Sequence, residues 1–237
     1  MDEIESSHWW YSGRRLIITS QIKKINLIRS SNILEVGSGT GGNLGMLSKF
    51  GKVYAFERNI KALNISKSKI KGKKIRIIHG SCPNNIPYTN LKFDLICLFD
   101  VLEHIVDDKK TLVNLKNRLN LNGKILLTVP SYQWLFGPHD KELHHKRRYS
   151  AKKIEKLIDD ANLKILRKSY FNSILFPLIA AVRIYEKLKR IEISMGNTEP
   201  KKEINYALLI IMKIEAFCLK FFNFPFGLSM IYVVKSK

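Results

Sequence analysis

The chain has 237 residues, a formal net charge of +21 and a pI near 9.9. A chain of this length can bury the core of one α/β domain with an appended subdomain. No uninterrupted apolar stretch reaches the roughly 18 residues that a membrane-spanning helix needs, and the N-terminal segment lacks the apolar core of a signal peptide. We therefore expect a cytoplasmic protein and leave open a peripheral contact with the inner face of a membrane.

The positive charge is spread along the chain and forms no long block. Two interpretations stay open: attraction to an anionic partner such as nucleic acid, phospholipid or a phosphorylated substrate, or a lysine-rich compositional bias. The three cysteines, Cys82, Cys97 and Cys218, show no CxxC spacing. They predict reduced thiols inside a cell, with neither a zinc site nor a disulfide framework.

Apolar runs alternate with amphipathic stretches along the first two thirds of the chain. A helix is expected over 14–29 from its apolar periodicity. The expected strands are 33–36, 52–56, 74–78, 93–99 and 123–130, and the expected helices between them are 41–50, 59–69 and 107–120. Because the strands are near-continuous apolar runs, they predict a parallel sheet covered by helices on both faces.

The remainder of the chain continues with less regular spacing. Ser150 has the position of an N-cap for a helix over 151–162, and residues 163–170 alternate as a sixth strand. Apolar segments follow at 174–182 and 204–222, separated by a lysine-rich helix and a polar break at 196–200, and residues 228–234 read as a final strand.

A glycine-rich turn follows the first strand in the run Glu35-Val36-Gly37-Ser38-Gly39-Thr40-Gly41, and Glu57 ends the second strand. In a βαβ unit this arrangement brings backbone close to a nucleotide-like ligand and aims a carboxylate at ribose hydroxyls. Glycine is needed in such a turn because a Cβ would hold the backbone away from the ligand.

This run resembles the signature of class I S-adenosylmethionine-dependent methyltransferases, and segments 93–96, 99–104 and 121–130 agree with the same family. The resemblance covers roughly residues 30–170. It implies a Rossmann-like, seven-stranded, mostly parallel α/β sheet whose last strand is antiparallel, with S-adenosylmethionine as the cofactor. The expected organisation is a core with an N-terminal helical lid in 1–170, an apolar helical insertion in 171–226 and a final core strand in 227–237.

The resemblance also implies which residues bind the cofactor. Glu57 is expected to accept hydrogen bonds from both ribose hydroxyls, and Glu35 either contacts the methionine end or holds the loop without touching the ligand. The family commonly has an Asp at the end of the third strand, where this chain has Ser81 and Cys82 instead, so one of these is expected to serve there. The other candidates for the cofactor site are Gly37, Ser38, Gly39, Gly41, Arg58, Phe99, Asp100 and Val101.

The loop that follows the fifth strand, residues 131–149, carries the densest set of polar side chains. His139 with Asp140 is the predicted general base, and Arg147 or Arg148 is a candidate clamp for a phosphorylated or carboxylated acceptor. A solvated basic loop is the alternative. The further candidates for the substrate site are Trp10, His104, Trp134, His145 and Tyr149. No metal site is predicted, because methyl transfer requires none and no metal-ligand spacing is present.

The N-terminal His8-Trp9-Trp10 segment with Gly13-Arg14 is similar to a segment of a subgroup of bacterial methyltransferases, in which it precedes the first strand and covers the cofactor pocket. The alternative is that these tryptophans only pack the first helix onto the core.

The leading functional hypothesis is methyl transfer to a small-molecule or lipid-linked acceptor by in-line displacement. The alternatives are an RNA methyltransferase, which charge alone suggests, and a non-catalytic cofactor-binding subunit. The insertion is expected to cover the substrate pocket, form a homodimer contact or lie on an anionic membrane surface.

Overall fold

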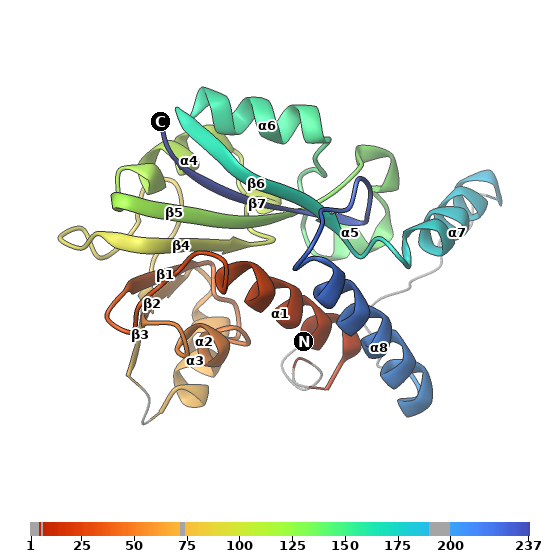
Figure 1. Ribbon diagram of the computed structural model, residues 1–237, viewed down its shortest axis with the longest axis horizontal. Coiled ribbons are helices and arrows are strands. Elements are labelled where there is room, and N and C mark those ends of the chain that lie inside the picture. The colour runs from red at the N-terminus through yellow and green to blue at the C-terminus, as the bar shows by residue number, and fades with distance from the viewer. Residues whose placement is uncertain (1–4, 6, 72–73, 190–199) are drawn as a thin grey trace.

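The computed structural model describes residues 5, 7–71, 74–189 and 200–237. Its centre is a seven-stranded sheet in the order β3-β2-β1-β4-β5-β7-β6, in which only β7 runs antiparallel to its neighbours (Figure 1). The strands are β1 (Asn32–Val36), β2 (Lys52–Glu57), β3 (Ile75–His79), β4 (Phe93–Phe99), β5 (Leu119–Pro130), β6 (Leu163–Phe171) and β7 (Ser229–Ser236). The predicted Rossmann-like fold with an antiparallel last strand is confirmed.

Helices cover both faces of the sheet and enclose two apolar layers. One layer receives side chains from α1 (Trp9–Ile22), α2 (Leu44–Leu47), α3 (Ile60–Lys69) and α8 (Lys202–Cys218). The other receives them from α4 (Asp108–Lys116) and α6 (Ala151–Asp160). The remaining helices are α7 (Phe176–Lys189), the short α5 (Pro138–Glu142), and the 3-10 turns η1 (Leu102–His104) and η2 (Gln133–Leu135).

Local side-chain caps explain where several helices begin. The Ser150 hydroxyl accepts a hydrogen bond from the Lys153 amide at 3.2 Å and starts α6 as predicted. Asn59 caps α3 and Asp107 caps α4 in the same manner, each accepting from backbone amides inside the first turn. The capping residues therefore start these helices close to where the amphipathic pattern predicts them to begin.

The first helix differs from the prediction of 14–29, because it begins and ends earlier. It starts at Trp9, where the His8 ring nitrogen accepts a hydrogen bond from the Trp10 amide at 3.2 Å. It stops at Ile22, and Asn26 then takes a left-handed conformation with φ 59°, which an α-helix cannot contain. Ile25 is buried even though it lies beyond the end of the helix. The periodic spacing of apolar residues therefore extends further along the chain than the helix does.

Two other helices are shorter in the structure than the sequence predicts. The predicted helix over 107–120 ends at Lys116, because the chain already joins the sheet at Leu119, which pairs with Phe93 of β4. The helix expected over 41–50 contracts to α2. The polar break at 196–200 lies, apart from Pro200, outside the described residues.

Helices α7 and α8 occupy the chain between β6 and β7, and α8 lies beside α1 (Figure 1). The buried Glu215 of α8 accepts hydrogen bonds from the amides of Ser173 at 2.8 Å and Ile174 at 3.2 Å, which ties α8 to the start of the segment. Division of the chain into units at residues 170 and 226 stays a prediction. Within the described residues, no helix is both long and apolar enough to cross a membrane.

The close crossing of α1 and α8 depends on Gly13. A Cβ added to Gly13 would lie 2.5 Å from the Cβ of Met212, which is itself fully buried. We predict that Gly13→Ala destabilises the protein, because overpacking costs roughly 1–3 kcal/mol and exceeds the gain of about 1 kcal/mol in helix propensity. A thermal melt should show a loss of roughly 2–4 °C for each kcal/mol.

Gly45→Ala is the matched control, because Gly45 also lies in a helix but has open space where a Cβ would be added. It should leave the melting temperature unchanged or raise it slightly. Equal effects of the two substitutions would contradict the assigned contact between α1 and α8.

Candidate functional site

A cavity of about 1060 Å³ opens at the carboxyl ends of β1, β2, β4 and β5. Its wall combines the glycine-rich turn after β1, the ends of β2 and β4, the first turns of α1, the loop after β5 and side chains from α7 and α8. Parallel strands end at this edge of an open α/β sheet, where such folds place their ligands. Segments far apart in the sequence therefore contribute to one pocket.

The glycine-rich turn exposes backbone to the cavity. Gly37 and Gly39 have φ of 65° and 54°, in the left-handed region that glycine adopts without strain. A Cβ on Gly37 would approach Val101 to 3.1 Å, whereas beside Gly39 the space is open. The amides of Gly37 and Ser38 donate to the Phe56 carbonyl at 3.0 and 3.2 Å, so the turn is anchored to β2.

Glu57 lies at the end of β2 and lines the cavity, as predicted. Its two carboxylate oxygens accept hydrogen bonds from the amides of Gly39 at 2.9 Å and Asn59 at 2.8 Å. Each oxygen keeps a further lone pair for a ligand hydroxyl. Glu57 therefore braces the turn and faces the pocket with the same carboxylate.

Glu35 and Gly41 are not among the described residues that line the cavity. The fully buried Glu35 carboxylate accepts a hydrogen bond from the Asn43 side chain at 2.9 Å, and Asn43 lines the cavity in its place. A Cβ on Gly41 would lie 2.5 Å from the Ser66 hydroxyl, so this glycine permits α3 to pack against the turn. Of the two roles considered for Glu35, its position favours the second, in which it holds the glycine-rich turn without touching a ligand.

The other predicted cofactor residues line the cavity as a group: Ser38, Arg58, Ser81, Cys82, Phe99, Asp100 and Val101. Burial raises the pKa of the Cys82 thiol to about 12. At neutral pH this thiol is protonated, so it can contribute packing and polarity but no reactive thiolate.

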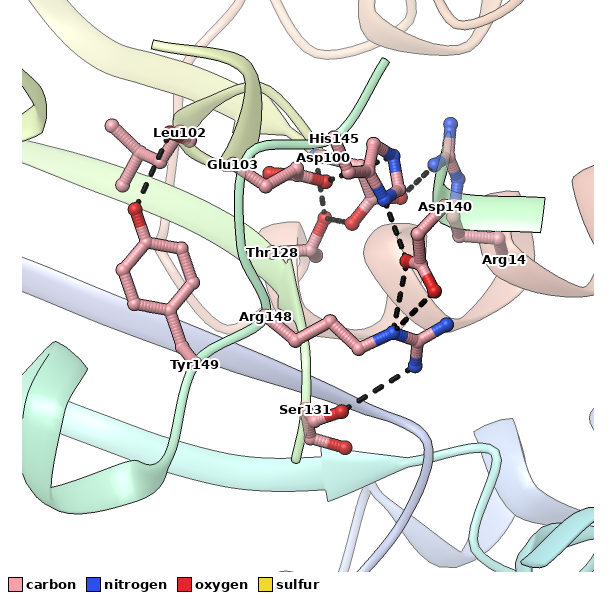
Figure 2. A network of polar contacts seen from close by, with 10 residues as sticks. All are labelled: Arg14, Asp100, Leu102, Glu103, Thr128, Ser131, Asp140, His145, Arg148 and Tyr149. Atoms are coloured by element: carbon pink, nitrogen blue, oxygen red, sulfur yellow. Dashed lines mark hydrogen bonds and ion pairs between the residues drawn. The ribbon is translucent and has the colours of Figure 1, made fainter. Parts of the chain in front are cut away.

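Asp100 is held by a network that sequence analysis did not single out. Its carboxylate forms an ion pair with Arg14 of α1 and accepts a hydrogen bond from the Thr128 hydroxyl at 2.9 Å (Figure 2). Both Arg14 and Asp100 line the cavity. The only signal for Arg14 was its place in the tryptophan-containing N-terminal segment, because its partner lies 86 residues away in the sequence.

Asp140 is the centre of the polar loop after β5. Its fully buried carboxylate receives Nε of Arg148 at 2.9 and 3.0 Å and Nδ1 of His145 at 2.8 Å (Figure 2). It also accepts a hydrogen bond from the Gly137 amide at 3.0 Å. Burial alone would raise the pKa of Asp140, but these donors outweigh it and lower the pKa to about 2. The histidine that hydrogen-bonds to Asp140 is therefore His145, where sequence analysis had paired Asp140 with His139.

His139 itself lines the cavity, and burial lowers its pKa, so the imidazole is neutral at pH 7. Three other predicted substrate residues do not belong to the described cavity wall. Arg147 pairs with Asp108 at 2.9 Å, and the fully buried Tyr149 donates to the same carboxylate at 2.7 Å. The side chain of Trp134 is half exposed beside Tyr132. These three residues support the loop from behind or lie at its surface.

Glu103 and His104 form the η1 turn after β4 and line the cavity together with His145. The rings of His104 and His145 meet edge to face with centroids 4.7 Å apart. The Glu103 side chain is fully buried, and desolvation raises its pKa well above the usual range. Burial and the neighbouring His145 lower the pKa of His104.

The N-terminal tryptophans serve both purposes that sequence analysis left open. Trp10 lines the cavity and stacks on Phe171 of β6 with centroids 6.1 Å apart. The Trp9 amide donates to the side chain of Asn205 in α8 at 2.8 Å. The segment therefore packs α1 onto the core and also forms part of the pocket wall.

The residues present fit S-adenosylmethionine. The Ser38 hydroxyl is buried with no hydrogen-bond partner among the described residues, and the open backbone at Gly39 and the Glu57 carboxylate face the same space. The volume is at the upper end of the roughly 300–1,000 Å³ typical of ligand pockets, which leaves room for an acceptor.

Comparisons with known proteins agree with this geometry. A family model described as a methyltransferase domain matches residues 13–168. The mitochondrial ubiquinone biosynthesis O-methyltransferase of Schizosaccharomyces pombe is 24% identical over 148 residues, which cover 55% of this chain and 53% of that protein. The match thus spans about half the length of this curated relative.

Two solved structures share the fold. An S-adenosylmethionine-dependent methyltransferase from Clostridium acetobutylicum has a TM-score of 0.63 at 18% identity, covering 95% of this chain and 92% of that chain. Phosphoethanolamine N-methyltransferase 2 from Haemonchus contortus, solved with S-adenosyl-L-methionine, has a TM-score of 0.58 at 14% identity, covering 91% and 51%.

The buried Glu35 predicts a pH dependence of stability. Desolvation raises its pKa from 4.5 to about 8, so between these values the folded protein holds a proton that the unfolded chain has lost. Its contribution to stability is therefore full below pH 4.5 and is lost as the pH rises toward 8, by about 1.4 kcal/mol per pH unit. Glu35→Gln should remove this slope in urea unfolding measured from pH 5 to 8.

The exposed Glu142→Gln is the control for the loss of one carboxylate. The difference in unfolding free energy between Glu35→Gln and wild type should grow with pH. A constant difference across the range would mean that Glu35 is ionised in the folded protein.

Proposed function

The chain belongs to the methyltransferase-domain family of class I S-adenosylmethionine-dependent enzymes, and we propose that it methylates a small-molecule or lipid-linked acceptor. Bound S-adenosylmethionine supplies a methyl group on a sulfonium centre, which suits in-line displacement by an aligned acceptor. The chain's own residues bind the cofactor, orient the acceptor and limit the access of water.

One observation carries the choice of acceptor: aliphatic side chains of α7 and α8 line the cavity. Leu178, Ile179 and Val182 of α7 and Leu208 of α8 line the same cavity as Gly39 and Glu57. These side chains offer an apolar surface to an acceptor bound in the cavity. This apolar surface favours a hydrophobic or lipid-linked molecule over a nucleic-acid strand, whose backbone carries a charge at every phosphate.

The arginines of the polar loop support the same choice. Arg148 forms an ion pair with Asp140, and Arg147 forms one with Asp108, so neither guanidinium group is available to bind an anionic acceptor. Arg183 of α7 pairs with Glu186 at 2.7 Å in the same way. Among the cationic side chains that line the cavity, Arg14, Arg148 and Arg183 are paired with carboxylates, whereas Arg58 and Lys146 form no ion pair with the described residues.

His139 is the proposed general base for a hydroxyl acceptor. It lines the cavity, and burial lowers its pKa, so it can accept a proton at neutral pH. Asp140 takes a different role from the predicted partnership with His139, since it positions His145 and Arg148.

The outer surfaces of α7 and α8 explain how a lipid-linked acceptor could be reached. Exposed apolar side chains follow one another on α8 and the turn after it, and Lys213 and Lys220 stand among them. These apolar side chains are Ile204, Ile210, Ile214, Phe217, Phe221 and Phe222. An apolar surface with interspersed lysines fits the interface of an anionic membrane.

Cofactor binding tests the first part of the proposal. Glu57→Ala removes a carboxylate that faces the pocket, and each charge-assisted hydrogen bond is worth about 1.5–3 kcal/mol, so titration calorimetry should show affinity for S-adenosylmethionine at least about tenfold weaker. Glu155→Ala is the control, because Glu155 lies in α6 and is not among the described residues that line the cavity, with circular dichroism to verify folding. Equal affinity in both variants would contradict the assigned site.

Transfer of a labelled methyl group tests the acceptor class. The protein is incubated with methyl-labelled S-adenosylmethionine and separately with lipid, polar-metabolite and RNA fractions of a cell extract. We expect label in the lipid or metabolite fraction, and His139→Gln should reduce it by about 10²–10⁴-fold if the acceptor is a hydroxyl. Label in RNA alone would refute the proposed acceptor.

Membrane contact is tested by sedimentation with vesicles of phosphatidylcholine and phosphatidylglycerol. The triple variant Ile210→Asn, Ile214→Asn, Phe217→Ser should lose most of its co-sedimentation, because apolar burial contributes about 25 cal/mol per Å². The control Val106→Asn, Leu121→Asn removes exposed apolar side chains away from α8. Equal sedimentation of both variants would exclude α8 as the contact surface.

A further inference from the structure

Three metal-compatible side chains converge at one edge of the cavity. Glu103 and His104 come from η1, and His145 comes from the loop after α5. One ligand atom of each lies within 4.8 Å of the other two, and Nε2 of His145 is 3.9 Å from Oε1 of Glu103. Figure 2 shows the Glu103 carboxylate beside the His145 ring.

The Glu103 carboxylate lacks the partners that a buried acid needs. The side chain is 0% exposed, and neither oxygen has a hydrogen-bond partner among the described residues. The nearby guanidinium groups are already engaged, Arg14 with Asp100 and Arg148 with Asp140. A buried polar group normally has a hydrogen-bond or metal partner, so the two Glu103 oxygens offer ligand capacity that no described residue uses.

His145 is already oriented as metal-bound histidines are. Its Nδ1 shares a hydrogen bond with Asp140 at 2.8 Å, which leaves Nε2 directed at Glu103. A carboxylate behind a histidine fixes the ring and raises the basicity of the opposite nitrogen in metal sites. Asp140 is itself held by hydrogen bonds from Arg148 and from the Gly137 amide, so the carboxylate that orients His145 is also fixed in position.

We propose that Glu103, His104 and His145 bind one divalent transition-metal ion, with Zn²⁺ as the reference ion. Two imidazole nitrogens and one carboxylate oxygen suit Zn²⁺ or Fe²⁺ rather than Mg²⁺ or Ca²⁺, which prefer oxygen ligands. All three residues line the cavity, so the remaining coordination positions open toward it. Reaching metal–ligand distances of about 2.0–2.2 Å requires side-chain shifts on the order of 1 Å.

The test measures metal binding without cofactor or acceptor, so its outcome is separate from that of methyl transfer. Full-length protein is stripped with a chelator and titrated with Zn²⁺ against a chromophoric competitor, and Co²⁺ absorption reports the ligands. We expect one equivalent of Zn²⁺ per chain, with no thiolate charge-transfer band for Co²⁺. Absence of stoichiometric binding, or a thiolate band that implicates Cys82, would overturn the proposal.

Variants assign the ligands. Glu103→Gln and His104→Gln should abolish stoichiometric binding, and Asp140→Asn should weaken it about 10–100-fold as an outer-shell change. His79→Ala, which removes a histidine outside the cluster, should leave the affinity unchanged. If Glu103→Gln does not fold by circular dichroism, His104→Gln decides, because His104 lies at the cavity wall. Unchanged affinity in His104→Gln would refute the site.

Discussion

The loop after β5, which forms part of the cavity wall, depends on the buried Asp140 carboxylate and its hydrogen bonds. This carboxylate collects donors from three points of one loop, Gly137, His145 and Arg148, and so gives a segment with little regular structure a single conformation. In this conformation the Lys146 amide donates a hydrogen bond to the Glu103 carbonyl at 2.9 Å, which joins the loop to the turn after β4. Removing one of these donors leaves a buried carboxylate with fewer partners, which is strongly destabilising.

Around the glycine-rich turn, single side chains also make structural contacts and line the cavity at the same time. Glu57 both braces Gly39 and lines the cavity, so the shape of the glycine turn and the shape of the cavity wall are coupled through one side chain. Asp100 is likewise tied to Arg14, which places α1 in the pocket wall instead of merely beside the sheet. The two halves of the pocket meet at the strand ends because parallel strands deliver both to one edge.

The high positive charge of the chain acquires a physical meaning only from its distribution. Arg14, Arg147 and Arg148 are paired with carboxylates, whereas lysines such as Lys213 and Lys220 are exposed among apolar side chains of α8 and the turn after it. A net charge of +21 therefore does not by itself indicate nucleic acid. The same total would suit a protein that approaches an anionic surface with one face.

The sequence by itself determined the sheet, the glycine turn and Glu57, because apolar periodicity, glycine spacing and strand-end position are local properties of a chain. It missed the start of α1, the contact of Arg14 with Asp100 and the cluster of Glu103, His104 and His145, whose members are up to 42 residues apart. It also assigned Arg147 and Tyr149 to the substrate, although both support the loop through Asp108. Only the tertiary structure decides which of several neighbouring polar residues faces the pocket, because that choice depends on burial and on partners from distant strands.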